Sequence, residues 1–299
     1  MKIHGGCGVE VVVVDDASTD KTQEVARALI SQYGTDRVRY IRLSCNAGAQ
    51  VARNRGILEA RGEHIMFVDS DDVPAANGIN ELCSVLKTQD RVDYAYGQVV
   101  LTDMSLKPLG SRAVVGTPYD GSDVGLAGYH WHTMGALYRV ECVKRIGLWN
   151  EALICSQDWE YQIRTKLFGG HGSFVPTVVG YWRQHSLDRI GGKSFRDDYA
   201  EATEPLFRSI HEHAKRASRN TPAFEVLLAK RLVRHAIYCG ANKRPQMKRK
   251  ILAMAASLAG GNAFVKISAR GFGYTPALLD SLALGALNRA KPVDLTKEL

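Results

Sequence analysis

The stretch His64-Ile65-Met66-Phe67-Val68-Asp69-Ser70-Asp71-Asp72 is an apolar run that ends on three carboxylates within four residues. Its short length and continuous apolarity predict a buried strand, centred on Ile65–Val68, in a mostly parallel sheet. The carboxyl end of such a strand opens into the crevice where α/β sheets bind ligands. Crowded carboxylates repel one another unless a cation neutralises them, so Asp69 and Asp71 are candidate oxygen ligands for Mg²⁺ or Mn²⁺. An ordinary acidic turn is the alternative interpretation.

The composition is that of a globular protein, because the 299-residue chain is 45% hydrophobic and 23% charged. A chain of this length can build a substantial core, and we expect one large domain plus an appendage. Its cysteines are scattered without a C-x-x-C pair, which predicts reduced thiols in a cytosolic protein. No apolar run approaches the roughly 20 residues of a membrane-spanning helix.

The positive charge is concentrated in the C-terminal part of the chain. The whole chain carries a net charge of +8, and from Leu206 onward Lys and Arg outnumber Asp and Glu by 17 to 5. Such asymmetry favours an anionic partner, either a membrane surface or nucleic acid. A solvated basic helical surface without a partner explains the pattern equally well.

Strands alternate with helices along the first 90 residues. Val9–Val14 predicts a buried strand that ends on Asp15 and Asp16. An amphipathic helix follows and ends at Gly34. The apolar face of this helix consists of Val25, Ala26, Leu29, Ile30 and Tyr33. A second strand over 38–43 and a second helix over 46–60 precede the acidic stretch, so the alternation predicts a right-handed parallel α/β core.

Later segments predict further elements. These are a helix over 78–87, a strand over 94–102, a hairpin-type excursion over 103–115, a helix over 140–146 and a strand over 173–179. The segment from Ser156 begins another helix, and Asp158 in its first turn is stabilised by the helix dipole. The same carboxylate would be a general base if it lay in the cleft. His130 and His132 suit either a metal pair on a strand or a buried aromatic cluster.

The C-terminal part predicts helices separated by a basic cluster. We expect a helix from Pro222 to Gly240, the cluster Lys243–Lys250, an apolar helix over 251–258 and another near 276–287. Polybasic segments beside amphipathic helices can hold a protein on anionic lipid. Packing of these helices against the rest of the protein is the alternative.

Residues 9 to about 190 resemble the family 2 glycosyltransferases, which have the GT-A fold and invert the anomeric centre. The resemblance rests on the order and spacing of several motifs together. These are Val13-Val14-Asp15-Asp16-Ala17-Ser18-Thr19-Asp20, Asn46-Ala47-Gly48, Ala52-Arg53-Asn54-Arg55-Gly56, Phe67-Val68-Asp69-Ser70-Asp71-Asp72, Gln157-Asp158-Trp159-Glu160 and Tyr181-Trp182-Arg183-Gln184-His185. It implies a GT-A domain over 1–200 and a basic helical region over 201–299.

The resemblance implies that most of the matched polar residues hold a nucleotide-sugar donor. These residues are Asp15, Asp16, Asn46, Arg53, Asp69 and Arg183. Asp16 corresponds to the acid that contacts the nucleotide base, and Asp69 to the acid on the ribose side. Asp71, together with Asp69 and His185, matches the metal-binding positions. A Mg²⁺ or Mn²⁺ ion is therefore the implied cofactor.

Asp158 matches the catalytic base of the family. It would take the proton of an acceptor hydroxyl whose oxygen attacks the anomeric carbon opposite the diphosphate, so one displacement inverts the stereochemistry. The implied activity is metal-dependent hexosyl transfer to a saccharide or lipid-linked acceptor, in cell-surface polysaccharide or glycolipid synthesis. The implied location is the cytoplasm, at the inner face of the membrane, and nucleic acid is not an expected partner.

Two departures from the family pattern leave alternatives open. The family's first strand and helix have no counterpart before Val9, which would expose a sheet edge and apolar surface. Gln157 stands where Glu is common. A glycosyltransferase-like module without activity is therefore one alternative. A phospho-receiver signalling domain is another, because Asp15, Asp16 and Asp69 suit it, but it leaves Asp158 unexplained.

Overall fold

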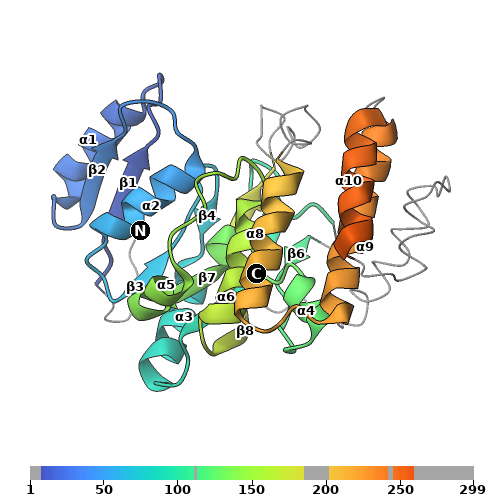
Figure 1. Cartoon of the computed structure of the whole chain (residues 1–299). Coiled ribbons are helices and arrows are strands. Elements are labelled where there is room, and N and C mark those ends of the chain that lie inside the picture. The colour runs from blue at the N-terminus through green and yellow to red at the C-terminus, as the bar shows by residue number, and fades with distance from the viewer. Residues whose placement is uncertain (1–7, 111–112, 185–201, 242–244, 259–299) are drawn as a thin grey trace. The chain divides into compact units, whose positions relative to one another are not determined.

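The structure is a computed structural model that describes residues 8–110, 113–184, 202–241 and 245–258 (Figure 1). The chain divides into two compact units, Met1–Asn220 and Thr221–Leu299. The first unit extends beyond residue 200, because it includes α8 (Thr203–Arg216). His185 and the helix expected near 276–287 lie outside the described residues.

The N-terminal part of the first unit is a small parallel sheet of β1 (Val11–Asp15) and β2 (Val38–Arg42). The helix α1 (Thr22–Tyr33) connects the two strands, and α2 (Ala49–Glu59) follows β2 (Figure 1). α1 ends at Gly34, as predicted, and the φ of 83° at this residue is a left-handed conformation that glycine adopts without strain.

The apolar face predicted for α1 is only partly buried. Ala26 is buried, but Val25 is 57% exposed, and Val11 on the neighbouring strand is 49% exposed. Among the described strands, β1 pairs with β2 alone, so its second edge has no strand partner there. The predicted sheet edge and exposed apolar surface beside β1 are therefore confirmed.

A second sheet forms the centre of the first unit. Its strand order is β3 (His64–Met66), β7 (Ala136–Arg139), β5 (Tyr94–Thr102), β8 (Gly172–Arg183) and β4 (Val73–Pro74), and β6 (Val114–Val115) pairs with β5. β5 and β8 are parallel, whereas the other pairs among the described strands of this sheet are antiparallel. The expected single, mostly parallel sheet is thus wrong in strand direction. The physical reason is that β7 enters the sheet from a loop and the short 3₁₀ helix η1 (Thr133–Gly135), not from a helical crossover.

Helices cover both faces of this sheet. Successive side chains of a strand point to opposite faces, so neighbouring residues of β5 pack against different helices. Tyr94 and Tyr96 of β5 pack with residues of α5 (Val140–Ile146) and α6 (Gln157–Phe168). Ala95, between them, packs on the opposite face with α3 (Ala76–Thr88). The short helix α4 (Asp123–Ala127) precedes η1.

An aromatic cluster holds the end of β3 next to α6. Trp149 and Tyr161 stack with their ring centres 4.2 Å apart and their planes within 7°. Phe67 meets the Trp149 ring edge-on, with a distance of 5.2 Å between ring centres. Because Phe67 lies just before Asp69 and Tyr161 lies on α6, this packing fixes two predicted site segments relative to each other.

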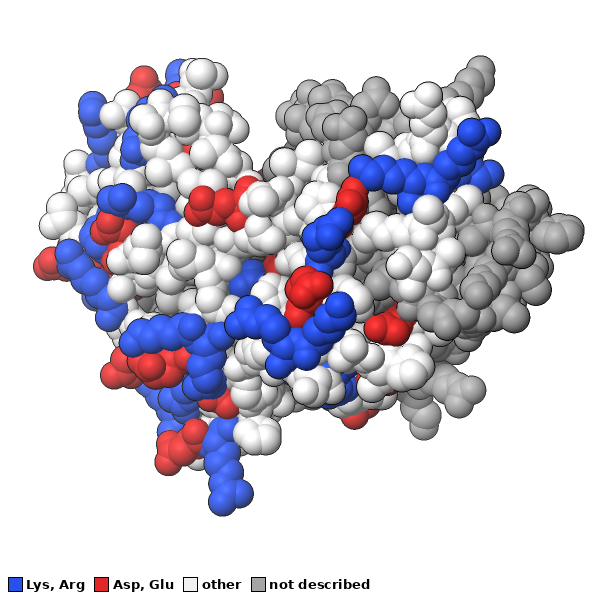
Figure 2. Space-filling model, in the orientation of Figure 1, with Lys and Arg blue, Asp and Glu red and all other residues white. Residues whose placement is uncertain are grey.

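The helix α8 alternates in charge on its exposed side (Figure 2). Arg208 pairs with Glu204, and Lys215 pairs with Glu212. Pairs of this kind on a solvated helix face add little stability, so α8 is held by its buried side. The side chains that it buries are Thr203, Leu206, Phe207, Ile210 and Ala214.

The second unit contains α9 (Pro222–Ala241) and α10 (Pro245–Leu258), which pack on each other. α9 follows the predicted helix from Pro222, and it buries Phe224, Leu228 and Leu232. The sequence predicted that the basic cluster precedes a helix over 251–258. In the structure α10 already begins at Pro245, so Lys248–Lys250 lie within the helix. Throughout the part of the chain that the structure describes, helices are too short or too polar to cross a membrane.

Candidate active site

Asp15, at the end of β1, binds the loop that follows it and two side chains of β2. Its buried carboxylate accepts hydrogen bonds from Ser18 N at 2.8 Å, Tyr40 OH at 2.5 Å and Arg42 Nη1 at 2.6 Å. Burial by itself raises the pKa of Asp15, but these hydrogen bonds and the Arg42 charge outweigh it and lower the pKa to about 2. The loop turns through Ala17, whose φ is 60°.

Asp16 organises the start of α2. Its carboxylate accepts hydrogen bonds from Ala47 N at 2.7 Å and Gly48 N at 2.8 Å. The Asn46 side chain donates to the Asp16 carbonyl oxygen at 3.3 Å. The two strand-end loops that carry predicted nucleotide-binding residues are therefore joined, with Asn46 exposed on their surface.

Arg53, on α2, reaches the acidic turn after β3. Its Nη2 donates to Asp69 Oδ1 at 2.6 Å, and its guanidinium lies 4.5 Å from the centre of the Trp149 ring. A planar guanidinium held between a carboxylate and an aromatic face is well ordered. The structure thus brings together two residues that were predicted separately from two motifs.

The rest of the acidic turn is attached to the end of β8. Arg183 Nε donates to the carbonyl oxygen of Asp71, and Arg183 N donates to Asp72 Oδ1 at 3.3 Å. Asp72 is buried, whereas Asp69 and Asp71 are half-buried. The two half-buried carboxylates are therefore partly accessible to solvent, and Arg183 lies beside Asp71.

His132 lies beside the acidic turn and the end of β8. Its Nδ1 is 3.8 Å from Asp72 Oδ2, and its ring packs against Trp182 with centres 4.6 Å apart. Burial lowers the pKa of His132, while the charges of Asp69 and Asp158 oppose this shift. The imidazole is held between Asp72 of the acidic turn and Trp182 of β8.

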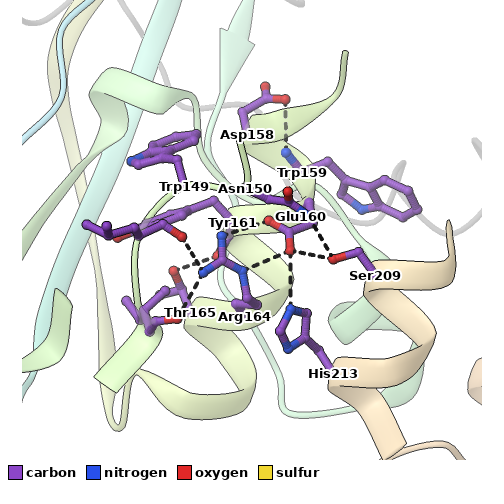
Figure 3. A network of polar contacts seen from close by, with 12 residues as sticks. Trp149, Asn150, Asp158, Trp159, Glu160, Tyr161, Arg164, Thr165, Ser209 and His213 are labelled. Carbon is purple, nitrogen blue, oxygen red and sulfur yellow. Dashed lines mark hydrogen bonds and ion pairs between the residues drawn. The ribbon is translucent and has the colours of Figure 1, made fainter. Parts of the chain in front are cut away.

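Asp158 occupies the first turn of α6, as Figure 3 shows. The preceding Ser156 has φ 50° and ψ 30°, a left-handed conformation that is uncommon outside glycine. Trp159 N donates to Asp158 Oδ1 at 2.9 Å, and Tyr129 OH donates to Asp158 Oδ2 at 2.7 Å.

A buried charge pair anchors α6 one turn further on (Figure 3). Arg164 donates to both Glu160 oxygens, at 2.9 and 2.8 Å. Ser209 Oγ of α8 donates to Glu160 Oε1 at 3.0 Å, and His213 Nε2 lies 3.5 Å from the same atom. This network holds α8 on the helix that carries Asp158.

The loop between α5 and α6 is bound to α2. Asn54 donates to Trp149 O at 2.9 Å and accepts from Trp149 N at 2.7 Å. Gln157 Nε2 donates to Gln50 Oε1 at 2.8 Å. α2 therefore positions Arg53 next to Asp69, and it also holds the segment that leads into Asp158.

Within the described residues, the candidate metal ligands predicted from the sequence are the carboxylates of Asp69 and Asp71. In the described ranges, no three His, Cys, Asp or Glu side chains gather into a metal site. Asp69 and Asp71 offer the oxygen ligands that Mg²⁺ and Mn²⁺ accept, and a diphosphate would supply further oxygens. His130 and His132 contact different groups, because His130 Nε2 is 2.7 Å from Gly125 O.

The sequence did not identify Tyr129 as a site residue, and it offered His132 only as one of a metal pair or as part of a buried aromatic cluster. Tyr129 is 29 residues away from Asp158, and only folding brings the two together. The signal available was the Gly- and aromatic-rich stretch over 125–138, which is also typical of a buried cluster.

Comparison with known proteins shows which family and which fold the chain is similar to. The family model described as Glycosyl transferase family 2 matches residues 5–145. Glycosyltransferase GlyG of Streptococcus pneumoniae is 39% identical over 82 residues, which are 27% of this chain and 27% of GlyG. The succinoglycan biosynthesis protein ExoO of Rhizobium meliloti is 37% identical over 109 residues, which are 36% of this chain and 28% of ExoO. The matches span about a quarter of the length of these relatives.

Among solved structures, the crystal structure of S. aureus TarS 1–349 is similar with a TM-score of 0.51 and 17% identity. The similarity covers 96% of this chain and 86% of that one. It shows a shared fold, the GT-A fold of mixed strands and flanking helices. Residues 5–145, just under half of the chain, are thus similar to glycosyltransferase family 2.

Proposed function

We propose that the protein is an inverting glycosyltransferase that transfers a hexose from a nucleotide-diphosphate donor to an acceptor hydroxyl group. The observation that carries the proposal is the packing of Phe67, two residues before Asp69, against Tyr161 of α6, three residues after Asp158, with ring centres 5.9 Å apart. The segments that carry a candidate donor-binding acid and a candidate base thus lie together. This proximity is what a direct displacement requires.

The donor would lie along the loops after β1 and β3. Asp16 and Asn46 would contact the nucleotide base, and Arg53 with Asp69 would contact the ribose. Asp15 would act by shaping the first loop, because its carboxylate already has three donors. Arg183 lies next to Asp71 and is placed for the diphosphate.

A Mg²⁺ or Mn²⁺ ion would be held by Asp71 and Asp69, with His185 as the remaining predicted ligand. When bound, such an ion offsets the negative charge of the leaving diphosphate. Arg183 would add a fixed positive charge on the same side.

Asp158 would act as the general base. The acceptor proton moves to the carboxylate while the acceptor oxygen bonds to the anomeric carbon. The bond from that carbon to the diphosphate oxygen breaks at the same time, and its electron pair leaves with the diphosphate. Attack from the opposite face inverts the anomeric centre.

The acceptor would be a saccharide or lipid-linked saccharide of a cell-surface polysaccharide or glycolipid. The name of the relative ExoO, a succinoglycan biosynthesis protein, supports this class. Lys248, Arg249 and Lys250 of α10 would hold the protein at the cytoplasmic face of an anionic membrane. Sedimentation with phosphatidylglycerol vesicles but not with phosphatidylcholine vesicles tests this contact.

Turnover of nucleotide sugars tests the activity. With Mn²⁺ and a panel of UDP-, GDP- and dTDP-sugars, the protein should release one nucleoside diphosphate. Asp158→Asn should lower that rate by about 10²–10⁴-fold, the usual contribution of a general base. Glu141→Gln is the matched control, because Glu141 is an exposed carboxylate in the first turn of α5. An unchanged rate for Asp158→Asn would contradict the proposal.

A further inference from the structure

Tyr129, in the loop before η1, places its hydroxyl against the carboxylate of Asp158. Tyr129 OH donates to Asp158 Oδ2 at 2.7 Å, while Trp159 N donates to Oδ1 at 2.9 Å. Both oxygens of the carboxylate therefore have a fixed donor. One donor comes from the backbone of α6 itself and the other from a segment 29 residues earlier in the chain.

Tyr129 is suited to act as a permanent donor. Burial raises the pKa of its hydroxyl well above the usual range, and the charge of Asp158 raises it further. The hydroxyl therefore keeps its proton and stabilises the carboxylate by a hydrogen bond. A carboxylate has about four lone-pair positions, so Asp158 still has room to accept an acceptor hydroxyl.

The position of Tyr129 is set by the same helix that carries Asp158. Lys166 Nζ, on α6, donates to three carbonyl oxygens of the segment Gly125–Gly128, at 3.2, 3.0 and 2.7 Å. Trp159 Nε1 donates to Ala127 O at 3.1 Å. These bonds fix the chain immediately before Tyr129.

The chain immediately after Tyr129 is held in the same way. Gln162 of α6 accepts a hydrogen bond from His130 N at 3.0 Å and donates one to Trp131 O at 2.6 Å. Gly128 allows the tight path of the loop, because a Cβ atom there would lie 2.6 Å from His130 Nε2. α6 and this loop thus form one rigid support for the contact between Tyr129 and Asp158.

We propose that Tyr129 is a positioning residue for glycosyl transfer, whose hydroxyl holds the Asp158 carboxylate in the orientation that receives the acceptor proton. The inference rests on the proposed function, since it assigns Asp158 as the base. Tyr129 itself exchanges no proton with substrate. Its loss would free the carboxylate to rotate out of line, which lowers the rate of the chemical step and leaves donor binding intact.

The test is Tyr129→Phe, which removes the oxygen and keeps the ring. With the nucleotide sugar that the wild type turns over, we expect kcat to fall by about tenfold to a hundredfold, as for loss of a hydrogen bond to a charged group. The KM for the donor and the affinity for its nucleoside diphosphate should not change. Tyr96→Phe is the matched control, because the buried Tyr96 hydroxyl accepts from Tyr119 N at 2.8 Å, outside the acidic site.

A double-mutant cycle separates positioning from a general structural effect. If Tyr129 acts only through Asp158, then Tyr129→Phe should cause no further loss in an Asp158→Ala background. A further loss of tenfold or more in that background, or a wild-type kcat for Tyr129→Phe alone, would overturn the inference.

The same experiment distinguishes the two proposals. A wild type that turns over a donor and loses activity with Asp158→Ala, but not with Tyr129→Phe, would refute the role of Tyr129 alone. A folded wild type that turns over no donor would refute the proposed function and, with it, the positioning role.

Discussion

Arg53 of α2 donates a hydrogen bond to Asp69 Oδ1 over 2.6 Å, with its guanidinium stacked 4.5 Å from the centre of the Trp149 ring. The contact joins α2, the turn after β3 and the loop that precedes α6. Arg53 is 14% exposed in its side chain, and Asp69 is 36% exposed. The pair therefore presents a carboxylate edge to solvent while the arginine behind it is fixed.

Replacing this arginine should weaken nucleotide binding. Arg53→Lys keeps the charge but loses the planar group that both stacks on Trp149 and orients Asp69. We expect about a tenfold loss of nucleoside diphosphate affinity, on the scale of one hydrogen bond to a charged group. Calorimetric titration measures it, with Arg55→Lys as the control because Arg55 is half-exposed and pairs with Glu59. Equal affinities for the two variants would refute this role.

Gln157→Glu should destabilise the protein, although Glu is the common residue of the family at this position. Gln157 Nε2 donates to Gln50 Oε1 and to Leu153 O, both at 2.8 Å. A carboxylate there has no donor and faces two acceptor oxygens, which costs about 1–3 kcal/mol. Urea unfolding measures the loss, with Gln89→Glu as the exposed control. A variant as stable as the wild type would show that this pair is readily rearranged.

The buried pair of Glu160 and Arg164 should contribute far more than the surface pairs of α8. Glu160→Gln removes one charge from a pair that is almost inaccessible to solvent, which costs about 3–5 kcal/mol. Glu204→Gln breaks an exposed pair with Arg208 and should cost less than about 1 kcal/mol. Denaturant unfolding of both variants checks the difference, and similar losses would contradict it.

Because of Asp15, the free energy of unfolding should fall at acidic pH. Its pKa is about 2 in the folded protein against a reference value of 3.8, so the ionised form stabilises the fold above about pH 4. That contribution is lost as the pH falls from about 4 toward 2. Wild type should exceed Asp15→Asn in free energy of unfolding at pH 6, by about 2 kcal/mol. The gap should narrow steadily below pH 4, and a gap that stays constant with pH would contradict the assignment.

Local sequence patterns predicted most elements of the fold. β5 over Tyr94–Thr102 and α5 over Val140–Ile146 have the predicted bounds, because each is marked by its own periodicity and end signals. The direction of β7 was not predictable in this way. Strand pairing depends on contacts between distant residues, and the antiparallel partners of β7 lie on β3 and β5.

For the candidate site too, local motifs were readable from the sequence, whereas contacts between distant residues were not. Asp16, Asp69 and Asp158 stand in short motifs at the ends of strands or in the first turn of a helix, and the family resemblance assigned their roles from those motifs. The burial of Asp15 and the contact of Tyr129 with Asp158 depend on residues at least 25 positions apart in sequence. Those relationships belong to the folded structure.

Donor binding is the central claim, and calorimetric titration with UDP, GDP and dTDP, each with and without Mn²⁺, tests it most directly. We predict metal-dependent binding of one of these nucleotides, and loss of that binding in Asp71→Ala. Glu141→Gln should bind like the wild type. A folded wild-type protein that binds none of the three nucleotides, with or without Mn²⁺, would contradict the account and favour a module that has lost its donor site.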